Sequence, residues 1–400
     1  MSTSSAENPV IVVGGGIGGL AAALGLSQAG HRVLVLERAA EIGEIGAGIQ
    51  LGPNAFAALD ALGVGEAARR RAVHTDRLVM MDAVDGSEVA HIPVGEAFRT
   101  RFGNPYAVIH RADILLSLYE GVQRAPNVTV RTATRIEQVA VDVGGVRVTD
   151  AEGRSYAGCA LVGADGVHSV VRRALVGDAH RVSGHVVYRG VVARQDMPED
   201  LRWNAASIWV VPNSHIVHYP LRGGEQYNLV VTFHSRETEE WGVREGSAEE
   251  VNSYFTEICE RPRRLLSRPT SWKRWSTADR DPVAQWGRDR ATLLGDAAHP
   301  MLQYLAQGAC MALEDAVTLR ESIRTAGGDL AAAFRLYESR RIVRTARVVL
   351  SAREMGRIYH AKGIERQVRN SLWQGRTPER FYDAMEWLYG WSVDRCMDRA

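Results

Sequence analysis

The sequence contains few cysteines, and none of the four has a spacing that suggests a metal site or a redox pair. Cys159, Cys259, Cys310 and Cys396 lie far apart, without CxxC or Cys/His ligand spacing. Isolated cysteines are typical of reduced thiols in a cytoplasm and argue against a disulfide scaffold or a zinc site. We therefore expect structural thiols, no bound metal and a cytoplasmic location.

Long apolar runs and blocks of like charge are also missing. The chain shows no uninterrupted run of about 18 apolar residues, the length that a membrane helix needs. The N-terminal MSTSSAENP lacks the basic region that begins a signal peptide. The 48 basic and 47 acidic residues leave a formal net charge of +1, without long blocks of either sign. These absences argue against membrane association and a nucleic-acid partner, and favour a small-molecule partner.

The chain has enough hydrophobic residues to form a large core. Its 400 residues are 46% hydrophobic, which suits one large α/β domain or two smaller ones. The N-terminal part reads as strand, glycine loop, helix and strand: PVIVV, GGGIGG, LAAALGLSQAG and HRVLVLER. Residues 10–13 are continuously apolar, as a strand buried on both faces requires. The pattern predicts a βαβ unit in a parallel sheet.

The glycine loop carries the spacing of a dinucleotide site. Gly14, Gly16 and Gly19 form GxGxxG between the strand and the helix, and Glu37 ends the second strand. Such glycines allow a tight turn, close approach of a pyrophosphate and close packing of helix on strand. A carboxylate at this point accepts hydrogen bonds from ribose hydroxyls and disfavours a 2′-phosphate. The bound dinucleotide is therefore expected to be FAD or NAD.

After the βαβ unit, the arrangement of apolar and polar residues along the chain changes twice. A short apolar run, CALVGADG, begins at Cys159, and residues 185–235 alternate between apolar and polar side chains, which predicts a mostly antiparallel sheet. From about residue 315 the chain is helical. Within that region we expect an exposed arginine stripe opposite an apolar face. The stripe is Arg340, Arg341, Arg344 and Arg347, and the apolar face is Ile342, Val343, Ala346, Val349 and Leu350.

Two later motifs decide between FAD and NAD through a family resemblance. GADGVHSVVRR, which contains Asp165 and Arg172, resembles the DG motif of flavoprotein aromatic hydroxylases, and GDAAHP, which contains Asp296, resembles their GD motif. The three motifs occur in the family's order. The chain thus resembles group A, single-component FAD-dependent monooxygenases. The resemblance implies an α/β fold with a Rossmann-like FAD-binding domain of the p-hydroxybenzoate hydroxylase type, an interleaved, mostly antiparallel substrate domain and a helical C-terminus.

The expected domains are discontinuous. The FAD-binding domain comprises residues 1–75, 101–180 and 285–325, and the substrate domain comprises residues 76–100 and 181–284. Residues 326–400 form a helical region, expected to provide the contact of a homodimer.

The resemblance also assigns cofactor residues beyond the glycines. Arg111 in HRADIL matches an arginine that binds FAD, and Asp296 matches an aspartate that contacts the ribityl chain. Asp165 and Arg172 are expected to serve FAD and the pyridine nucleotide, although a structural turn with an ion pair is an alternative. Further expected contacts are Glu37, Arg38, Gln50 and Gly308. Because only one GxGxxG is present, NADH or NADPH is expected to visit transiently, reduce the flavin and leave, after which O2 reacts.

The substrate site is expected at HIVHYPLRGG and in the middle of GDAAHPMLQYLAQGA. Alternation along a strand places His215 and Tyr219 on one face. By resemblance to the 3-hydroxybenzoate 6-hydroxylase branch, His215 is the candidate base and Gln303 its hydrogen-bonding partner. Tyr219, Tyr106 and Val187 are candidate substrate contacts.

The expected chemistry is hydroxylation of a phenolic acid through a C4a-hydroperoxyflavin. Oxygen enters para to an activating hydroxyl, so 3-hydroxybenzoate would give 2,5-dihydroxybenzoate (gentisate). Salicylate 1-hydroxylase, which releases the carboxyl group and gives catechol, is the alternative. A flavin reductase without hydroxylation, or a ligand sensor, is a further alternative.

Overall fold

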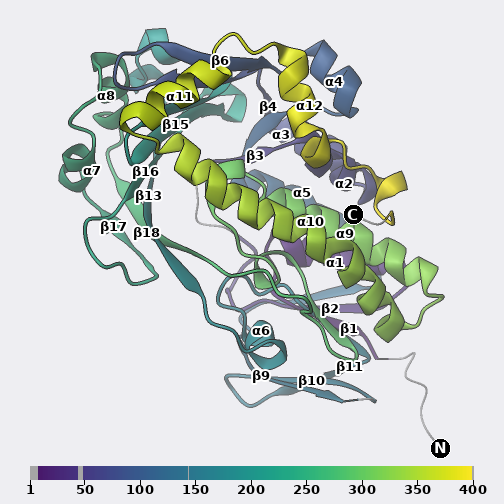
Figure 1. Ribbon diagram of the computed structural model, residues 1–400. Coiled ribbons are helices and arrows are strands. Elements are labelled where there is room, and N and C mark those ends of the chain that lie inside the picture. The colour runs from purple at the N-terminus through teal and green to yellow at the C-terminus, as the bar shows by residue number, and fades with distance from the viewer. Residues whose placement is uncertain (1–7, 44–47, 143, 399–400) are drawn as a thin grey trace, which may run out of the picture.

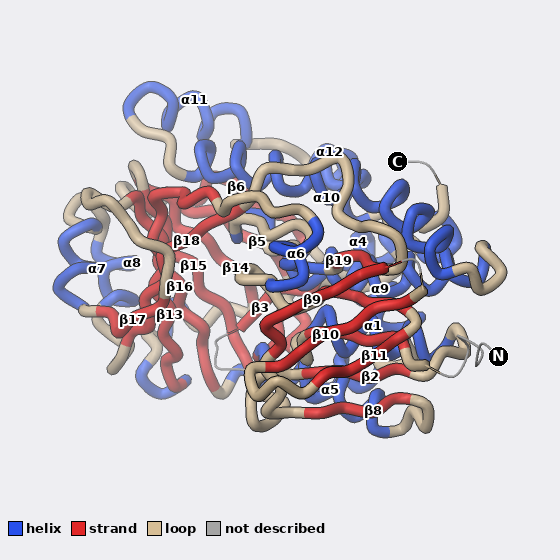
Figure 2. The backbone as a smooth tube through the Cα atoms, turned by 90° about the horizontal axis from the view of Figure 1, so that it is seen from below, coloured by secondary structure: helices blue, strands red, loops and turns tan. Residues whose placement is uncertain are grey.

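The computed structural model describes residues 8–43, 48–142 and 144–398. The prediction that the N-terminus is no signal peptide concerns the first seven residues, which lie outside the described residues. Two large sheets lie side by side, with the long helices α9 (Gly308–Thr325) and α10 (Leu330–Tyr359) packed together across the molecule (Figures 1 and 2). The mixed α/β fold and the helical C-terminal part confirm the predicted fold class.

The first sheet contains the predicted βαβ unit. Strands β1 (Val10–Val13) and β2 (Val33–Leu36) are parallel neighbours and are connected by α1 (Ile17–Gln28). The strand order is β19-β12-β1-β2-β8, and every pairing is parallel. All four residues of β1 are buried, which explains its uninterrupted apolar sequence. The remaining strands are β8 (Val128–Arg131), β12 (Ala160–Gly163) and β19 (Ala291–Leu293).

The second sheet has the order β17-β18-β13-β16-β15-β14-β5-β6 and is antiparallel except between β14 and β5. This arrangement confirms the predicted antiparallel layer. Its strands are β5 (Arg77–Asp82), β6 (Glu88–Pro93), β13 (Arg181–Ala193), β14 (Ala205–Val211), β15 (Ser214–Leu221), β16 (Gln226–His234), β17 (Val243–Gly246) and β18 (Trp272–Asp279).

Two small sheets complete the strands. One contains β3 (Gly48–Leu51), β4 (Val73–His74) and β7 (Ala107–His110), and the other contains β9 (Ile136–Asp142), β10 (Gly145–Asp150) and β11 (Ser155–Gly158). In the first, β3 is fixed to the large antiparallel sheet, because the Gly48 amide donates to the Asn228 side chain over 3.1 Å.

Shorter helices cover the sheets and their edges. Helices α7 and α8 lie beside the antiparallel sheet, whereas α11 and α12 lie near β6 and α4 (Figures 1 and 2). The remaining helices are α2 (Pro53–Ala61), α3 (Gly65–Arg71), α4 (Glu96–Phe102), α5 (Arg111–Gln123), α6 (Val170–Leu175), α7 (Ala248–Tyr254), α8 (Glu260–Leu266), α11 (Gly363–Trp373) and α12 (Pro378–Tyr389). Short 3-10 turns are η1 (Arg194–Asp196), η2 (Glu199–Leu201), η3 (Arg222–Gly224), η4 (Gly295–Ala297), η5 (Gln303–Leu305) and η6 (Val393–Arg395).

Separate hydrophobic cores lie behind the two sheets. One joins the parallel sheet to α1 and α9, and another joins the antiparallel sheet to α7 and α8. A third cluster connects the antiparallel sheet to the C-terminal helices through Tyr219, Val348 and Tyr389. The domain limits given above remain a prediction.

The prediction of an exposed arginine stripe on α10 is correct for Arg347 and wrong for Arg341 and Arg344. Arg341 is buried and Arg344 is half-buried, while Val343 and Leu350 of the expected apolar face are 60% and 50% exposed. Both arginines form ion pairs with Glu314 of α9 over 2.6 Å. The face of α10 that meets α9 is therefore the charged one, because α9 supplies buried carboxylates.

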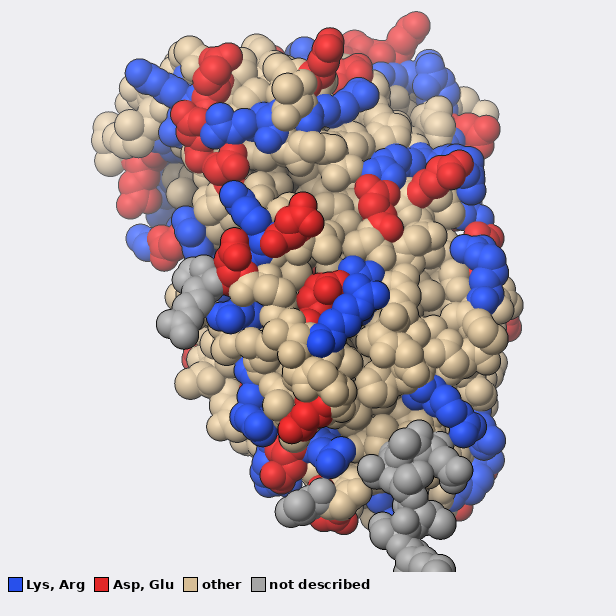
Figure 3. All heavy atoms as spheres, turned by 90° about the vertical axis from the view of Figure 1, so that its right-hand side faces the viewer, with Lys and Arg blue, Asp and Glu red and all other residues tan. Residues whose placement is uncertain are grey.

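Acidic and basic residues are interspersed on the face shown in Figure 3. Within the described ranges, none of the helices has the length and apolarity needed to cross a membrane.

Candidate active site

A cavity of about 2070 Å³ is lined by both large sheets and by α9, α10 and α12. Pockets for small molecules usually have about 300–1,000 Å³. The cavity therefore has room for a dinucleotide together with a second small molecule.

The glycine loop forms one end of this cavity. Gly14 has a φ of +106°, and a Cβ there would lie 2.3 Å from the Ala164 carbonyl oxygen, so only glycine fits. Gly16 precedes α1, lines the cavity, and would place a Cβ in open space. Gly19 is outside the described lining. A Cβ on Gly19 would lie 1.9 Å from the Gly14 carbonyl oxygen, so this glycine allows close packing of helix on loop.

The carboxylate of Glu37 borders the same end. It accepts hydrogen bonds from the Gly15 amide over 2.5 Å and from the Ala39 amide over 2.8 Å. Arg38 and Arg111 also line the cavity. The structure thus brings the predicted cofactor residues of the glycine loop, β2 and α5 to one wall.

The DG segment supports this wall through hydrogen bonds. Asp165 lines the cavity, and its carboxylate accepts from Ser169 Oγ over 2.5 Å and from the Val170 amide over 2.7 Å. Burial raises the pKa of Asp165. Arg172 pairs with Asp178 over 2.7 Å and donates to the Ala297 carbonyl over 3.0 Å. These contacts match the alternative of a structural turn with an ion pair, and they connect the DG segment to the GD segment.

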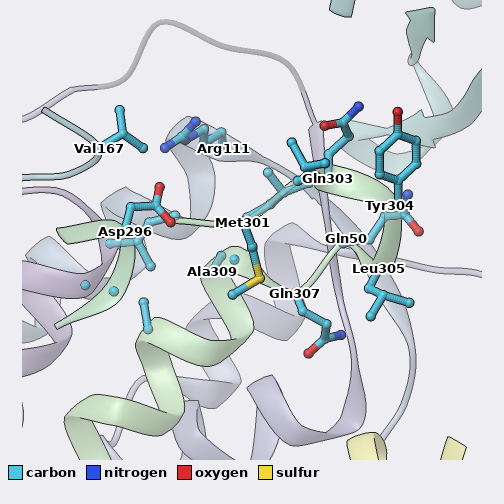
Figure 4. A pocket seen from close by; sticks show the side chains of 18 of the residues that line it. Gln50, Arg111, Val167, Asp296, Met301, Gln303, Tyr304, Leu305, Gln307 and Ala309 are labelled. Atoms are coloured by element: carbon cyan, nitrogen blue, oxygen red, sulfur yellow. The ribbon is translucent and has the colours of Figure 1, made fainter. Parts of the chain in front are cut away.

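The GD segment runs along the cavity from the predicted cofactor residue Asp296 to the predicted substrate residue Gln303. Asp296 lies in η4, Gln303 and Tyr304 lie in η5, and Gly308 begins α9. In Figure 4 the Asp296 side chain lies at one end of this segment and Gln303 and Tyr304 at the other, with Met301 between them. A Cβ on Gly308 would lie 3.7 Å from Asp296 Oδ1, so the start of α9 is close to this carboxylate.

Buried charges hold the GD segment in place. His299 Nε2 lies 2.6 Å from Asp315 Oδ2, and the Gly295 amide donates to the same oxygen over 3.0 Å. Arg341 Nε donates to the other Asp315 oxygen over 2.6 Å. Burial acts to raise the pKa of Asp315, but these partners, His299 first among them, lower it to about 2. His299 is therefore engaged in shaping the loop.

A second group of contacts fixes the start of α9. The Asn54 side-chain amide donates to Gln307 over 2.9 Å and to Glu314 over 2.7 Å. Gln307 is the residue before α9 and lines the cavity. Helix α2 therefore positions the helix N-terminus that faces the cavity.

The predicted substrate residues lie mainly on β15. Its residues His215, Val217 and Tyr219 line the cavity, and the intervening Ile216 and His218 are outside the described lining. This confirms the alternation expected for the strand. Burial lowers the pKa of His215 to about 3 and raises that of Tyr219 well above its usual range.

His215 and Gln303 come together through the neighbouring strand. His215 is opposite Thr232 of β16, and Gln303 Nε2 donates to the Thr232 hydroxyl over 3.4 Å. Val187 of β13 is opposite Thr232 on its other side. Val187 is buried, shares the face of His215 through these pairings, and is not among the described residues that line the cavity. Its role as a substrate contact stays a prediction.

Tyr106 connects the predicted substrate and cofactor residues. It lines the cavity, and its hydroxyl donates to the Gln50 side chain on β3. Burial raises the pKa of Tyr106 well above its usual range, so its hydroxyl stays protonated at neutral pH.

Two histidines near this site were missed in the sequence. His360, the residue after α10, places Nε2 2.9 Å from His215 Nδ1, and His185 Nδ1 lies 2.8 Å from the Tyr304 hydroxyl. Neither residue belongs to a motif, and His360 is far from His215 in sequence. The alternation along β13 was the one available signal for His185.

The donor set and the shape of the cavity fit FAD. Gly16 leaves its Cβ position open at the N-terminus of α1, where a pyrophosphate is favoured. Glu37 offers a carboxylate to a ribose, and Asp296 offers another beside the start of α9. Of the residues described, no three His, Cys, Asp or Glu side chains are grouped so that they could hold a metal ion.

Comparison with known proteins identifies the family. A family model described as FAD binding domain matches residues 7–350. The chain is 66% identical to 3-hydroxybenzoate 6-hydroxylase of Polaromonas naphthalenivorans (strain CJ2), with 99% of both chains covered. It is 62% identical to 3-hydroxybenzoate 6-hydroxylase of Klebsiella oxytoca, with 97% of this chain and 98% of the relative covered.

Solved structures show the same fold along the whole chain. A salicylate hydroxylase in a substrate complex has a TM-score of 0.83 at 26% identity and covers 99% of both chains. Klebsiella pneumoniae HpxO, complexed with FAD and uric acid, has a TM-score of 0.84 at 25% identity and covers 99% of this chain and 98% of its own. The chain therefore belongs to the FAD binding domain family and, within it, to the FAD-dependent aromatic hydroxylases.

Proposed function

We propose that this chain hydroxylates 3-hydroxybenzoate at C6 and releases 2,5-dihydroxybenzoate, using NADH or NADPH and O2. The observation that carries the proposal is that His215 and Gln303, both next to Thr232, lie in the same cavity as Asp296 and the glycine loop. The names of the two relatives above, which match over nearly their whole length, support the same substrate.

Bound FAD would supply the activation of O2, and a transient nicotinamide would supply the electrons. Gly14, Gly16 and Glu37 would hold the adenosine and pyrophosphate end, while Asp296 would hold the ribityl chain. The protein must then place the substrate ring at the flavin end of the cavity and keep water away from it.

The apolar residues Val217, Met301 and Leu305 line the cavity near the polar groups and exclude water from the ring. The amide of Gln303 would orient the phenolic oxygen. His215 would accept the phenolic proton at Nε2, because its Nδ1 is engaged by His360. Removing this proton makes the carbon para to the oxygen more nucleophilic, and in 3-hydroxybenzoate that carbon is C6.

Tyr106 and Tyr219 are proposed as contacts to the substrate. Both line the cavity and both keep a neutral hydroxyl. The Tyr219 hydroxyl can donate a hydrogen bond to the carboxylate without adding a buried charge. The Tyr106 hydroxyl already donates to Gln50, so Tyr106 would contact the substrate ring.

The proposal is tested by a panel of phenolic acids with the purified holoenzyme. We expect 3-hydroxybenzoate to accelerate NADH oxidation, with matching O2 uptake and gentisate formation. Catechol from salicylate as the main product would support the decarboxylating alternative. NADH oxidation that yields peroxide and no hydroxylated product with any acid of the panel would support a reductase, and binding without NADH oxidation would support a sensor.

We also propose that the protein acts as a cytoplasmic homodimer, with residues 326–400 providing the contact. Three apolar residues at successive turns of α11 support this contact: Ile364, Val368 and Leu372 are 70%, 50% and 69% exposed. The cysteines, all free thiols and mostly buried, support a reducing compartment. Light scattering of the wild type and of Leu372→Glu would measure the mass and its dependence on this face.

A further inference from the structure

His215 is the group that would accept the substrate proton, and it is surrounded by neutral groups. It is 3% exposed, and the rings of Tyr304, Tyr359 and His360 lie 5.6, 5.9 and 5.1 Å from its ring. Burial lowers the pKa of His215 to about 3. An imidazolium at this position is therefore unstable at neutral pH, and a proton that arrives on the ring has to leave it.

His360 is the neighbouring group that can take this proton from His215. Its Nε2 lies 2.9 Å from His215 Nδ1, it is half-buried, and it is not among the described residues that line the cavity. It therefore contacts His215 from outside the described cavity lining, and part of the residue is exposed to solvent.

The backbone keeps the two rings together. His360 caps the C-terminus of α10, and its amide donates to the Gly356 carbonyl over 3.1 Å. Its own carbonyl accepts from the Asn213 amide over 3.0 Å. Asn213 lies in the turn between β14 and β15, two residues before His215. The end of α10 is thus fixed to the strand that carries the base.

We propose that His360 is a relay residue that takes the substrate proton from His215 and delivers it to solvent. This inference rests on the proposed function, since it requires a phenol in the cavity. The relay requires that His215 Nδ1 donates to His360 Nε2 in the resting state. The phenolic O–H bond breaks as an N–H bond forms at His215 Nε2. The N–H bond at His215 Nδ1 breaks as one forms at His360 Nε2, and His360 Nδ1 releases its proton to water.

This sequence of steps needs no stable charged imidazole. One proton enters, one leaves, and each ring stays neutral before and after the transfer. A phenolate remains on the substrate. The geometry thus allows a buried histidine to act as a base, although burial opposes its protonation.

Two variants of His360 test the relay in the holoenzyme. His360→Gln keeps a hydrogen-bond acceptor beside His215 but cannot pass a proton on, and His360→Ala leaves a space that imidazole from solution can fill. We expect both variants to bind FAD and 3-hydroxybenzoate like the wild type, and to form product about 100-fold more slowly. Added imidazole should restore much of the rate in His360→Ala and none in His360→Gln.

His234→Gln is the matched control, because His234 is also a histidine close to this site and its side chain is exposed. Its ring lies 5.1 Å from that of His185, outside the His215–His360 pair. We expect its rate to match the wild type. An unchanged rate in His360→Gln, an equal loss in His234→Gln, or a loss in His360→Ala that imidazole does not restore would overturn the relay.

The wild type separates failure of the relay from failure of the proposed function. If the wild type hydroxylates a different phenolic acid, the proposed substrate is wrong, and the same variants are compared with that acid. If the wild type turns over 3-hydroxybenzoate and the variants behave like the wild type, the relay alone is wrong.

Discussion

At the scale of single residues, burial determines what each group of the cavity can do. Burial lowers the pKa of His215 to about 3 and raises that of Tyr359 to about 12, so both are neutral at neutral pH. A neutral imidazole has one ring nitrogen free to accept a proton. The part of the cavity around His215 therefore contains a neutral imidazole and a neutral hydroxyl.

Replacing His215 with glutamine should remove the base and keep the volume of the side chain. We expect His215→Gln to retain FAD and to form hydroxylated product about 100-fold more slowly. The measurement is product formed per NADH oxidised, together with the single-turnover rate. His218→Gln is the control, since His218 is buried on the opposite face of β15. A wild-type product yield in His215→Gln would rule out the proposed role.

Gly16 gives a second test at this scale. The Cβ of Gly16→Ala would meet no protein atom within 4 Å and would point into space that the pyrophosphate needs. We expect FAD to bind about tenfold more weakly or worse, a loss of about 1.4 kcal/mol, while the thermal stability of the apoprotein stays unchanged.

Gly95→Ala is the matched control for Gly16→Ala. Gly95 also precedes a helix, also has open space around its Cβ position, and is outside the described cavity lining. It should leave FAD affinity unchanged. Equal FAD affinities in Gly16→Ala and the wild type would contradict the assignment of the pyrophosphate site.

At the scale of elements, α9 and α10 connect the cofactor end to the rest of the chain through buried charges. Arg341 of α10 binds Glu314 and Asp315 of α9 over 2.6 Å each, and Asp315 in turn holds His299 and the Gly295 amide. The GD segment that lines the cavity is therefore held in place by contacts with the helix pair α9 and α10.

Removing Arg341 should be costly because it takes one ion-pair partner from each of two buried carboxylates, Glu314 and Asp315. We expect Arg341→Met to lower the free energy of unfolding by about 3–5 kcal/mol. Denaturant unfolding of the holoenzyme measures this value. Arg357→Met, at a position where the arginine is 79% exposed and pairs with Glu354, should change it by less than about 0.5 kcal/mol. Similar effects in the two variants would contradict the buried network.

The same helices show what could be predicted from the sequence. The glycine loop, the strands beside it and the alternation on β15 were predictable, because each depends on residues that are close in sequence. The orientation of α10 was predicted wrongly, since periodicity marks two faces and does not show which one meets acidic side chains. His360 could not be found for a similar reason: its contact with His215 arises when the end of α10 meets the turn between β14 and β15.

At the scale of the whole molecule, the buried histidines make stability depend on pH. Burial lowers the pKa values of His185, His215 and His218 to about 4, 3 and 4. Between these values and the ordinary histidine pKa of 6.5, the unfolded chain binds protons that the folded chain does not. Acid therefore favours unfolding in this range.

We expect the free energy of unfolding to fall as the pH is lowered from about 6.5 to 4.5, by up to about 1.4 kcal/mol per pH unit for each such histidine. Denaturant unfolding at a series of pH values measures the slope. His215→Gln should have a shallower slope than the wild type. Stability that rises toward pH 4.5 would contradict the burial of neutral histidines.

The proposed function requires that one cavity joins an FAD site to a site that directs oxygen para to a phenolic hydroxyl. The most direct test is the reaction of the purified holoenzyme with NADH, 3-hydroxybenzoate and O2 labelled with oxygen-18. We predict 2,5-dihydroxybenzoate with one labelled oxygen in the new hydroxyl group, formed in proportion to the NADH oxidised. Unlabelled product, a hydroxyl at another position, or peroxide in place of product would contradict the account.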